Sequence, residues 1–164
     1  MPQNSPPTTA KGFVQLLSVI HLVFFGIVLA FAVFAFFFSE NVGLELEEVN
    51  GFFIIGIPVL LIGSIVLGNF LFKKILAQAH DKIALKEKLQ IYQISTFIRY
   101  VLVEGPALFA LMALILTGNL VYLLLASICL VYLYYLKPGK EKIKQDLQLS
   151  GEALRKFTND SEKL

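Results

Sequence analysis

Glu104 is the residue whose type and surroundings most strongly suggest chemistry in this sequence. It is the only acidic residue within four long apolar runs, where it precedes Gly105 and Pro106. A charged side chain at the centre of a membrane helix costs about 3 kcal/mol on insertion scales, so such residues usually serve a partner, a water-filled cavity or an ion. We therefore consider Glu104 a candidate proton or ion carrier, with His21 as its candidate relay partner.

Other polar residues are expected at the same depth as this pair. Counted at 1.5 Å per residue from Phe13 and Phe97, where the first and third apolar runs begin, His21 and Glu104 each lie about 11 Å into their runs. We expect these two runs to be neighbours and His21 to face Glu104. The supporting polar layer would consist of Gln15, Ser18, Asn69, Arg99 and Tyr100.

Pro106 is expected to kink the third run. Proline has no amide hydrogen, so it leaves the carbonyl oxygen of Leu102 without its helical donor. With Gly105 removing side-chain bulk, this carbonyl and the Glu104 carboxyl would form a small polar pocket that a neighbouring helix or water must satisfy. The alternative interpretation is a polar cluster that only fixes packing, with Glu104 protonated or paired with His21 or Arg99.

No pattern of catalytic or metal-binding residues is recognisable. Cys129 is the only cysteine and lies in an apolar run, and His80 has no cysteines or carboxylates near it at metal-site spacing. Serine–histidine–aspartate, cysteine–histidine and phosphate-loop arrangements are also missing. We expect no enzymatic activity, no cofactor and no metal.

Composition places the chain among membrane proteins. Hydrophobic residues make up 57% and charged residues 16%, and the mean hydropathy is +0.74. The net charge of +2 is too small to indicate a nucleic-acid partner. Because about 20 apolar residues cross the bilayer as a helix, and because helices satisfy their own amides in lipid, we predict an all-α fold. It is an antiparallel bundle of four transmembrane helices near residues 13–38, 52–72, 97–116 and 120–136.

Lysine distribution predicts the orientation of this bundle. The first connection carries Glu45, Glu47 and Glu48 and no basic residue, whereas the second connection and the C-terminal tail are rich in lysine. By the positive-inside rule, the second connection, the tail and both termini lie in the cytoplasm. Residues 117–119, Thr-Gly-Asn, predict a tight turn between the third and fourth helices.

Outside the bundle we predict two further segments. Residues 1–10 have the polar, proline-rich composition of a disordered leader, and the transmembrane domain then covers residues 11–137. Residues 138–164 form a cytoplasmic amphipathic tail, in which Ile143 and Leu147 predict a short helix along the inner membrane surface. Ser150 is the expected N-cap of another short helix. Residues 75–92 are expected to extend the second and third helices into the cytoplasm.

The segment Val103–Leu116 resembles the ion-carrying helix of rotary ATPase proteolipid (c-type) subunits. In that helix a carboxylate is followed by a small or proline-containing stretch, an aromatic residue and a run of Leu, Val and Ala, as in Val-Glu-Gly-Pro-Ala-Leu-Phe here. The resemblance implies that Glu104 binds the ion. The sequence departs from the family pattern, because the second run lacks dense glycines and the two halves do not repeat. As a whole, the chain resembles small uncharacterised four-span bacterial inner-membrane proteins, which implies that location.

Three functions are compatible with these features of the sequence. We favour a structural or accessory membrane subunit that contacts the lipid bilayer and a membrane-protein partner or a second copy of itself. The second function is proton or cation handling through Glu104, and the third is a component of a small transporter. A transporter acting alone usually shows repeats or paired broken helices, and only Pro106 marks such a break.

Overall fold

The computed structural model describes residues 9–39, 42–44 and 51–159, with the side chains of residues 51 and 52 left aside. These residues include six α-helices and no β-strand, and an isolated bridge joins Gly43 to Asn119. The predicted all-α fold is confirmed. Most of the predicted leader (1–10) and the acidic residues 45–48 lie outside the described residues.

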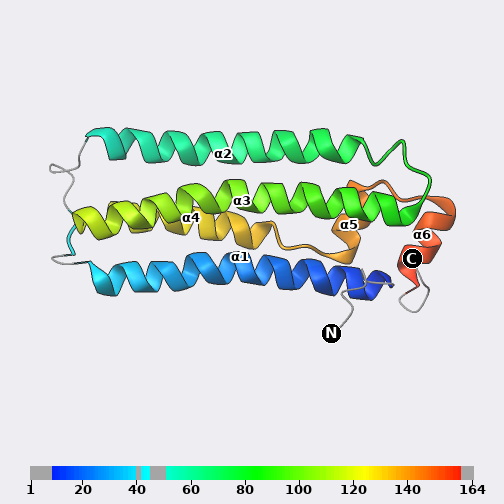
Figure 1. Cartoon of the computed structure of the whole chain (residues 1–164), viewed down its shortest axis with the longest axis horizontal. Helices are drawn as coiled ribbons and strands as arrows, with labels where there is room; N and C mark the ends of the chain where they lie inside the picture. Colours follow the sequence, from blue (N-terminus) through cyan, green and yellow to red (C-terminus); the bar gives the residue numbers. More distant parts are fainter. Residues whose placement is uncertain (1–8, 40–41, 45–50, 160–164) are drawn as a thin grey trace, which may run out of the picture.

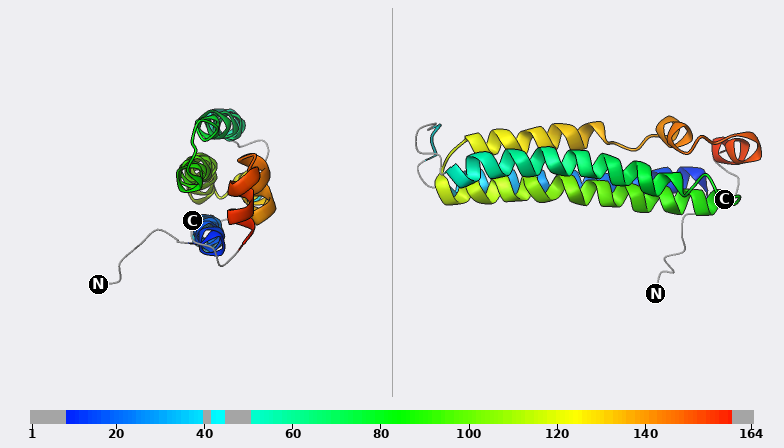
Figure 2. Two further views of the ribbon diagram at one scale, coloured as in Figure 1. Left: turned by 90° about the vertical axis from the view of Figure 1, so that its right-hand side faces the viewer. Right: turned by 90° about the horizontal axis from the view of Figure 1, so that it is seen from above.

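Three long helices form the body of the molecule: α1 (Ala10–Phe38), α2 (Gly51–Ala77) and α3 (Leu85–Thr117). Each is long and apolar enough to cross a membrane. α3 is central, because α1, α2 and α4 all pack on it, and the end-on view shows α1 and α2 on opposite sides of α3 (Figure 2). Both α2 and α3 extend beyond their predicted apolar runs, at residues 73–77 and 85–96, as expected for helical extensions.

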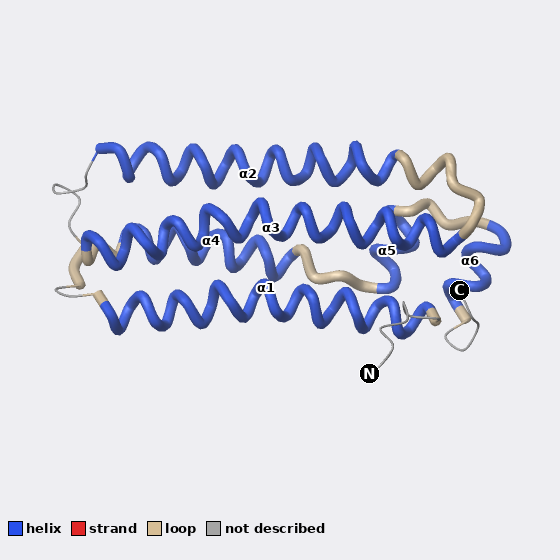
Figure 3. Tube along the Cα trace, viewed as in Figure 1, coloured by secondary structure: helices blue, strands red, loops and turns tan. Residues whose placement is uncertain are grey.

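The fourth predicted span is a short helix followed by a break. α4 (Val121–Tyr135) has only 15 residues, or about 22 Å of helix. The chain then runs through Pro138 into α5 (Lys140–Asp146), whose axis is bent by 83° from that of α4. Figure 3 shows this loop between the two helices. The described part of the chain thus has three candidate spans, or four if α4 and α5 count as one broken span.

Different elements lie at the two ends of the bundle. At one end, here called the termini end, lie the start of α1, the α2–α3 connection and the C-terminal helices (Figure 1). At the opposite end α3 turns into α4 through Gly118, whose φ of 68° is a left-handed conformation that a side chain would strain. The amide of Gly118 donates to Leu114, and the carbonyl of Gly118 accepts from Gly43. The predicted tight turn at residues 117–119 is confirmed.

The C-terminal helices dock on the termini end of the bundle. The predicted short helices are present as α5 and α6 (Gly151–Thr158), and Ser150 is the N-cap of α6, although its side chain makes no capping hydrogen bond. Their apolar side chains Ile143, Leu147 and Phe157 are buried inside the protein. They share a cluster with Phe13, Leu17, Phe72, Leu76, Leu89 and Tyr92 from α1, α2 and α3. This differs from the expected helix along the membrane surface, because the long helices project past the main core and offer a protein surface instead.

Gly68 brings α2 close to α3. A Cβ atom at Gly68 would lie 3.6 Å from Cγ of Arg99 and 3.8 Å from Cβ of Leu102, whereas at Gly56 and Gly63 it would meet nothing within 4 Å. The close approach at Gly68 matches the role of small residues in membrane helix packing. It places the Arg99 side chain directly against α2.

Candidate functional site

Side chains from α1 and α3 cap the end of α4. The amide of Lys137 donates to Tyr134 rather than one turn back to Leu133, whose carbonyl oxygen accepts from the amide of Leu136 at 3.0 Å instead. A carbonyl oxygen has a second lone pair, and the carbonyl of Leu136 follows the last turn, so both can accept from side chains. Nε2 of His21 lies 2.8 Å from the carbonyl oxygen of Leu133, and the hydroxyl of Tyr100 donates to the carbonyl oxygen of Leu136 at 3.1 Å. A carbonyl oxygen only accepts, so Nε2 of His21 carries its hydrogen.

Aromatic packing holds these two caps in place. The ring of His21 lies edge-on to that of Tyr100, with 5.6 Å between centroids, and stacks on Phe25. Phe24, one turn along α1, packs on both Phe97 and Tyr100 of α3. His21 is only 7% exposed. The predicted neighbourhood of the first and third helices is confirmed by these contacts.

The predicted contact between His21 and Glu104 is not formed. Phe97 and Tyr100 precede Glu104 by seven and four residues and pack on Phe24, so Glu104 lies on the same α1-facing stripe, one turn further from the termini end. Tyr100 instead faces His21. Glu104 has no hydrogen bond or ion pair to any described residue, and its buried Oε1 atom has no donor. A relay role for either residue stays a prediction.

A second polar cluster joins α2, α3 and α4. The hydroxyl of Tyr132 lies 2.8 Å from Nδ2 and 3.1 Å from Oδ1 of Asn69, and Nη2 of Arg99 donates to that hydroxyl at 3.1 Å. Cζ of Arg99 also lies 4.9 Å from the ring centroid of Phe72 and 5.9 Å from that of Tyr132. Cation–π attraction of this kind is strongest where the charge is removed from water. Asn69 and Arg99, two residues of the predicted polar layer, thus both bond to the hydroxyl of Tyr132.

Sequence reasoning did not single out Tyr132, which links this cluster. The signal for it is the group of tyrosines at 132, 134 and 135 near the end of an apolar run. A tyrosine in apolar surroundings usually brings its hydroxyl to a hydrogen-bonding partner. Two polar residues of neighbouring runs at the same depth, Asn69 and Arg99, were within reach as partners.

Lys142 of α5 adds a second cation close to Arg99. Burial lowers the pKa of Lys142, and the positive charge of Arg99 lowers it further, whereas Asp146 acts in the opposite direction. Neither Arg99 nor Lys142 forms an ion pair within the described residues. The buried Nε of Arg99 has no acceptor. The cluster therefore has positive charge and a spare donor.

The remaining predicted site residues do not join either cluster. Gln15 is exposed, and Ser18 donates to the carbonyl oxygen of Val14 in its own helix at 2.8 Å. α3 continues as one helix through Pro106. A Cβ atom at Gly105 would meet nothing within 4 Å, so this glycine faces open space rather than the side of a polar pocket.

Comparison with known proteins adds no information on function. The chain matches no protein-family model, no curated protein and no solved structure.

Proposed function

We propose that the protein is a multi-pass membrane protein with a structural or accessory role and with both termini in the cytoplasm. The three candidate spans support membrane insertion. The lysines of the α2–α3 connection and of the tail support the orientation. A bacterial cytoplasmic membrane is proposed from the resemblance of the four-run architecture to that of small bacterial inner-membrane proteins.

The observation that carries the proposal is that four interior polar side chains, those of His21, Asn69, Arg99 and Tyr100, form bonds from α1, α2 and α3 to α4 or its C-terminal end. His21 and Tyr100 tie α1 and α3 to the end of α4, and Tyr132 ties α4 to Asn69 and Arg99. A transport path needs polar groups that exchange one partner for another. Side chains that fix helix ends and crossings serve packing, which favours a structural role over a transporter.

One face of α2 is suited to a membrane-protein partner or a second copy of the chain. Ile55, Val59, Ile62 and Val66 recur at helical spacing, and each is more than 60% exposed. In a bilayer this stripe faces lipid or another helix. An accessory subunit would use it to pack against its partner.

The threading is tested with single cysteines that replace Glu45 and Ser150. Cys129, which is buried, is first replaced by alanine so that each variant has one thiol. We expect a membrane-impermeant thiol reagent to label position 45 and spare position 150 on intact cells. Permeabilised cells, in which both positions should react, are the control. Labelling of position 150 alone on intact cells would reverse the proposed orientation.

A second candidate function, proton or cation handling, is favoured by one observation. The buried Oε1 atom of Glu104 has no hydrogen-bond donor among the described residues, although an unsatisfied buried acceptor usually costs about 1–3 kcal/mol. An ion or proton that comes and goes would satisfy it part of the time.

Substitution and chemical modification of Glu104 separate the two functions. For a packing role we expect Glu104→Gln to fold with near wild-type stability and Glu104→Lys to lose about 3 kcal/mol, because lysine would place a charge on the α1-facing stripe. Stability is measured by unfolding in mixed detergent micelles. Ion handling instead requires reaction with a hydrophobic carbodiimide between about pH 5 and pH 8, absent in Glu104→Gln. If Glu104 does not react anywhere in that range, the ion-handling function is excluded.

A further inference from the structure

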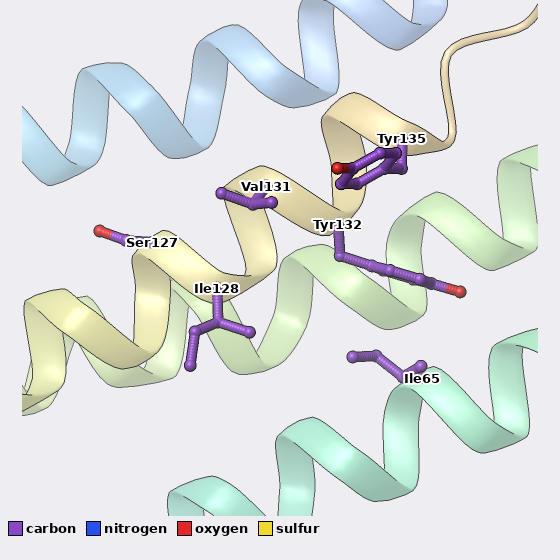
Figure 4. A pocket seen from close by; sticks show the side chains of 6 residues that line it. All are labelled: Ile65, Ser127, Ile128, Val131, Tyr132 and Tyr135. Atoms are coloured by element: carbon purple, nitrogen blue, oxygen red, sulfur yellow. The ribbon is translucent and has the colours of Figure 1, made fainter.

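An apolar groove separates α2 from α4. Both helices pack mainly on α3 rather than on each other, which leaves a hollow of about 420 Å³ between them. Figure 4 shows the ring of Tyr132 reaching from α4 toward α2, and Ile65 as the side chain of α2 on this groove. The lining residues are Ile65, Ser127, Ile128, Val131, Tyr132 and Tyr135.

Two cationic side chains donate hydrogen bonds to tyrosines at the termini end of this groove. Arg99 donates to the hydroxyl of Tyr132 at 3.1 Å, and Nζ of Lys142 donates to the backbone carbonyl of Tyr135 at 3.4 Å. Both cations are partly exposed. Asp146, whose charge acts on Lys142, already accepts the hydroxyl hydrogen of Tyr92 at 3.2 Å. The apolar groove therefore ends at two positive charges that have no ion-pair partner in the described part of the chain.

We propose that this groove binds an anionic phospholipid, with an acyl chain along Ile65, Ile128 and Val131 and the phosphate at Arg99 and Lys142. A guanidinium offers paired N–H donors that match phosphate oxygens. Basic pockets between membrane helices on the cytoplasmic side bind anionic headgroups. The inference rests on the proposed membrane insertion and orientation, which place the two cations near the inner leaflet.

Charge complementarity favours a lipid over a second copy of the chain as the occupant. α2 and α4, whose apolar faces are exposed, contain no acidic residue, and α2 ends with Lys73 and Lys74. A second copy seated through either helix would bring no negative charge to Arg99. The phosphate of an anionic lipid supplies that charge, and the acyl chain of the lipid fills the apolar groove.

The test uses the absence of tryptophan from the chain. The substitution Tyr135→Trp places the only tryptophan in the groove, and Lys142 keeps its acceptor because it contacts the backbone of Tyr135. The full-length protein is reconstituted in phosphatidylcholine vesicles that contain a small fraction of brominated phosphatidylglycerol or of brominated phosphatidylcholine. Bromine quenches tryptophan fluorescence at short range, so quenching reports which lipid occupies the groove.

We expect brominated phosphatidylglycerol to quench the introduced tryptophan more than brominated phosphatidylcholine does. Each cation near a membrane surface contributes about a fivefold preference for an anionic lipid. Arg99→Gln and Lys142→Gln should each remove about that factor, and Lys142→Gln leaves the Asn69–Tyr132 contact intact. The matched control is Phe70→Trp, about 140° around α2 from Ile65 and 59% exposed in the wild type. It should be quenched equally by both lipids.

Three results would contradict the proposal in distinguishable ways. Equal quenching of Tyr135→Trp by the two lipids would show that the groove does not select an anionic headgroup. Quenching of Phe70→Trp but not of Tyr135→Trp would show that protein fills the groove, either a second copy or a partner's helix. Failure of both lipids to quench either variant, with protein that does not float with the vesicles, would overturn the proposed membrane insertion itself.

Discussion

Replacing Phe157 by alanine should release α6 from the bundle. The Phe157 side chain is fully buried in the cluster at the termini end, beside Phe13 and Leu17 of α1. Truncating a buried phenylalanine costs about 3–5 kcal/mol. α6 has only eight residues, three of them charged, and Phe157 is its one buried residue. Few other contacts of α6 can therefore offset the lost free energy of docking.

Limited trypsin digestion of the purified protein measures this release. α6 contains Arg155 and Lys156, and cleavage at these sites follows the population in which the helix is undocked when opening is fast. We expect Phe157→Ala to be cleaved about 100-fold faster than the wild type. Leu154→Ala, on the same helix at a side chain already 37% exposed, should be cleaved at nearly the wild-type rate. Equal cleavage of the two variants would mean that Phe157 does not hold the tail.

Tyr100→Phe should destabilise the bundle although it removes a single oxygen atom. The hydroxyl of Tyr100 caps the carbonyl oxygen of Leu136, where α4 ends, and a buried acceptor left without a donor costs about 1–3 kcal/mol. His21→Leu should act in the same direction but with a smaller effect, because the carbonyl of Leu133 keeps the amide of Leu136 as a donor at 3.0 Å. The free energy of unfolding is measured from the loss of helical circular dichroism as sodium dodecyl sulfate is added to a mild detergent.

Tyr122 provides the matched control for this measurement. It is another fully buried tyrosine, but its hydroxyl has no hydrogen-bond partner in the described structure. Tyr122→Phe removes the same atom without breaking a bond, so it should leave the stability unchanged or raise it. If Tyr100→Phe were as stable as Tyr122→Phe, the capping of α4 would have no energetic weight.

Much of the helical architecture could be predicted from the sequence, because the signals for it are local. Apolar runs located α1 to α4, and residues 117–119 located the turn between α3 and α4. The spacing of Ile143 and Leu147 located α5, and Ser150 as an N-cap located α6. The depth of a residue also follows from counting along a helix. For this reason Asn69 and Arg99 were placed at one level, where Tyr132 joins them.

The partners of His21 and Glu104 could not be predicted in the same way. Depth alone left several partners equally close, and the choice between them depends on rotation about each helix axis and on where α4 stops. α4 stops at Tyr135, so the carbonyl oxygens of Leu133 and Leu136 lack the amide donor four residues on that an uninterrupted helix supplies, and side chains donate to them instead. His21 is used for one of these acceptors. His21 is therefore not available as a partner for Glu104, which lies one turn further along α3.

The docking of the C-terminal helices on the bundle could not be predicted from the sequence of the tail alone either. Ile143 and Leu147 define an apolar face, and such a face fits a membrane surface as well as a protein surface. The choice depends on Leu85, Leu89 and Tyr92, which lie far away in the sequence and present a complementary surface only after α3 has formed.

The docked tail has a consequence for the order of biosynthesis. Phe13 and Leu17 near the start of the chain share one buried cluster with Ile143, Leu147 and Phe157 near its end. Chains are made from the N-terminus and their early parts fold first. This cluster is therefore complete only after α5 and α6 have been synthesised, although α2 and α3 contribute to it earlier. A chain that stops short of α6 lacks Phe157 and leaves part of this cluster exposed, and the exposed apolar surface would mark it as incomplete to the proteases and chaperones that monitor newly made proteins.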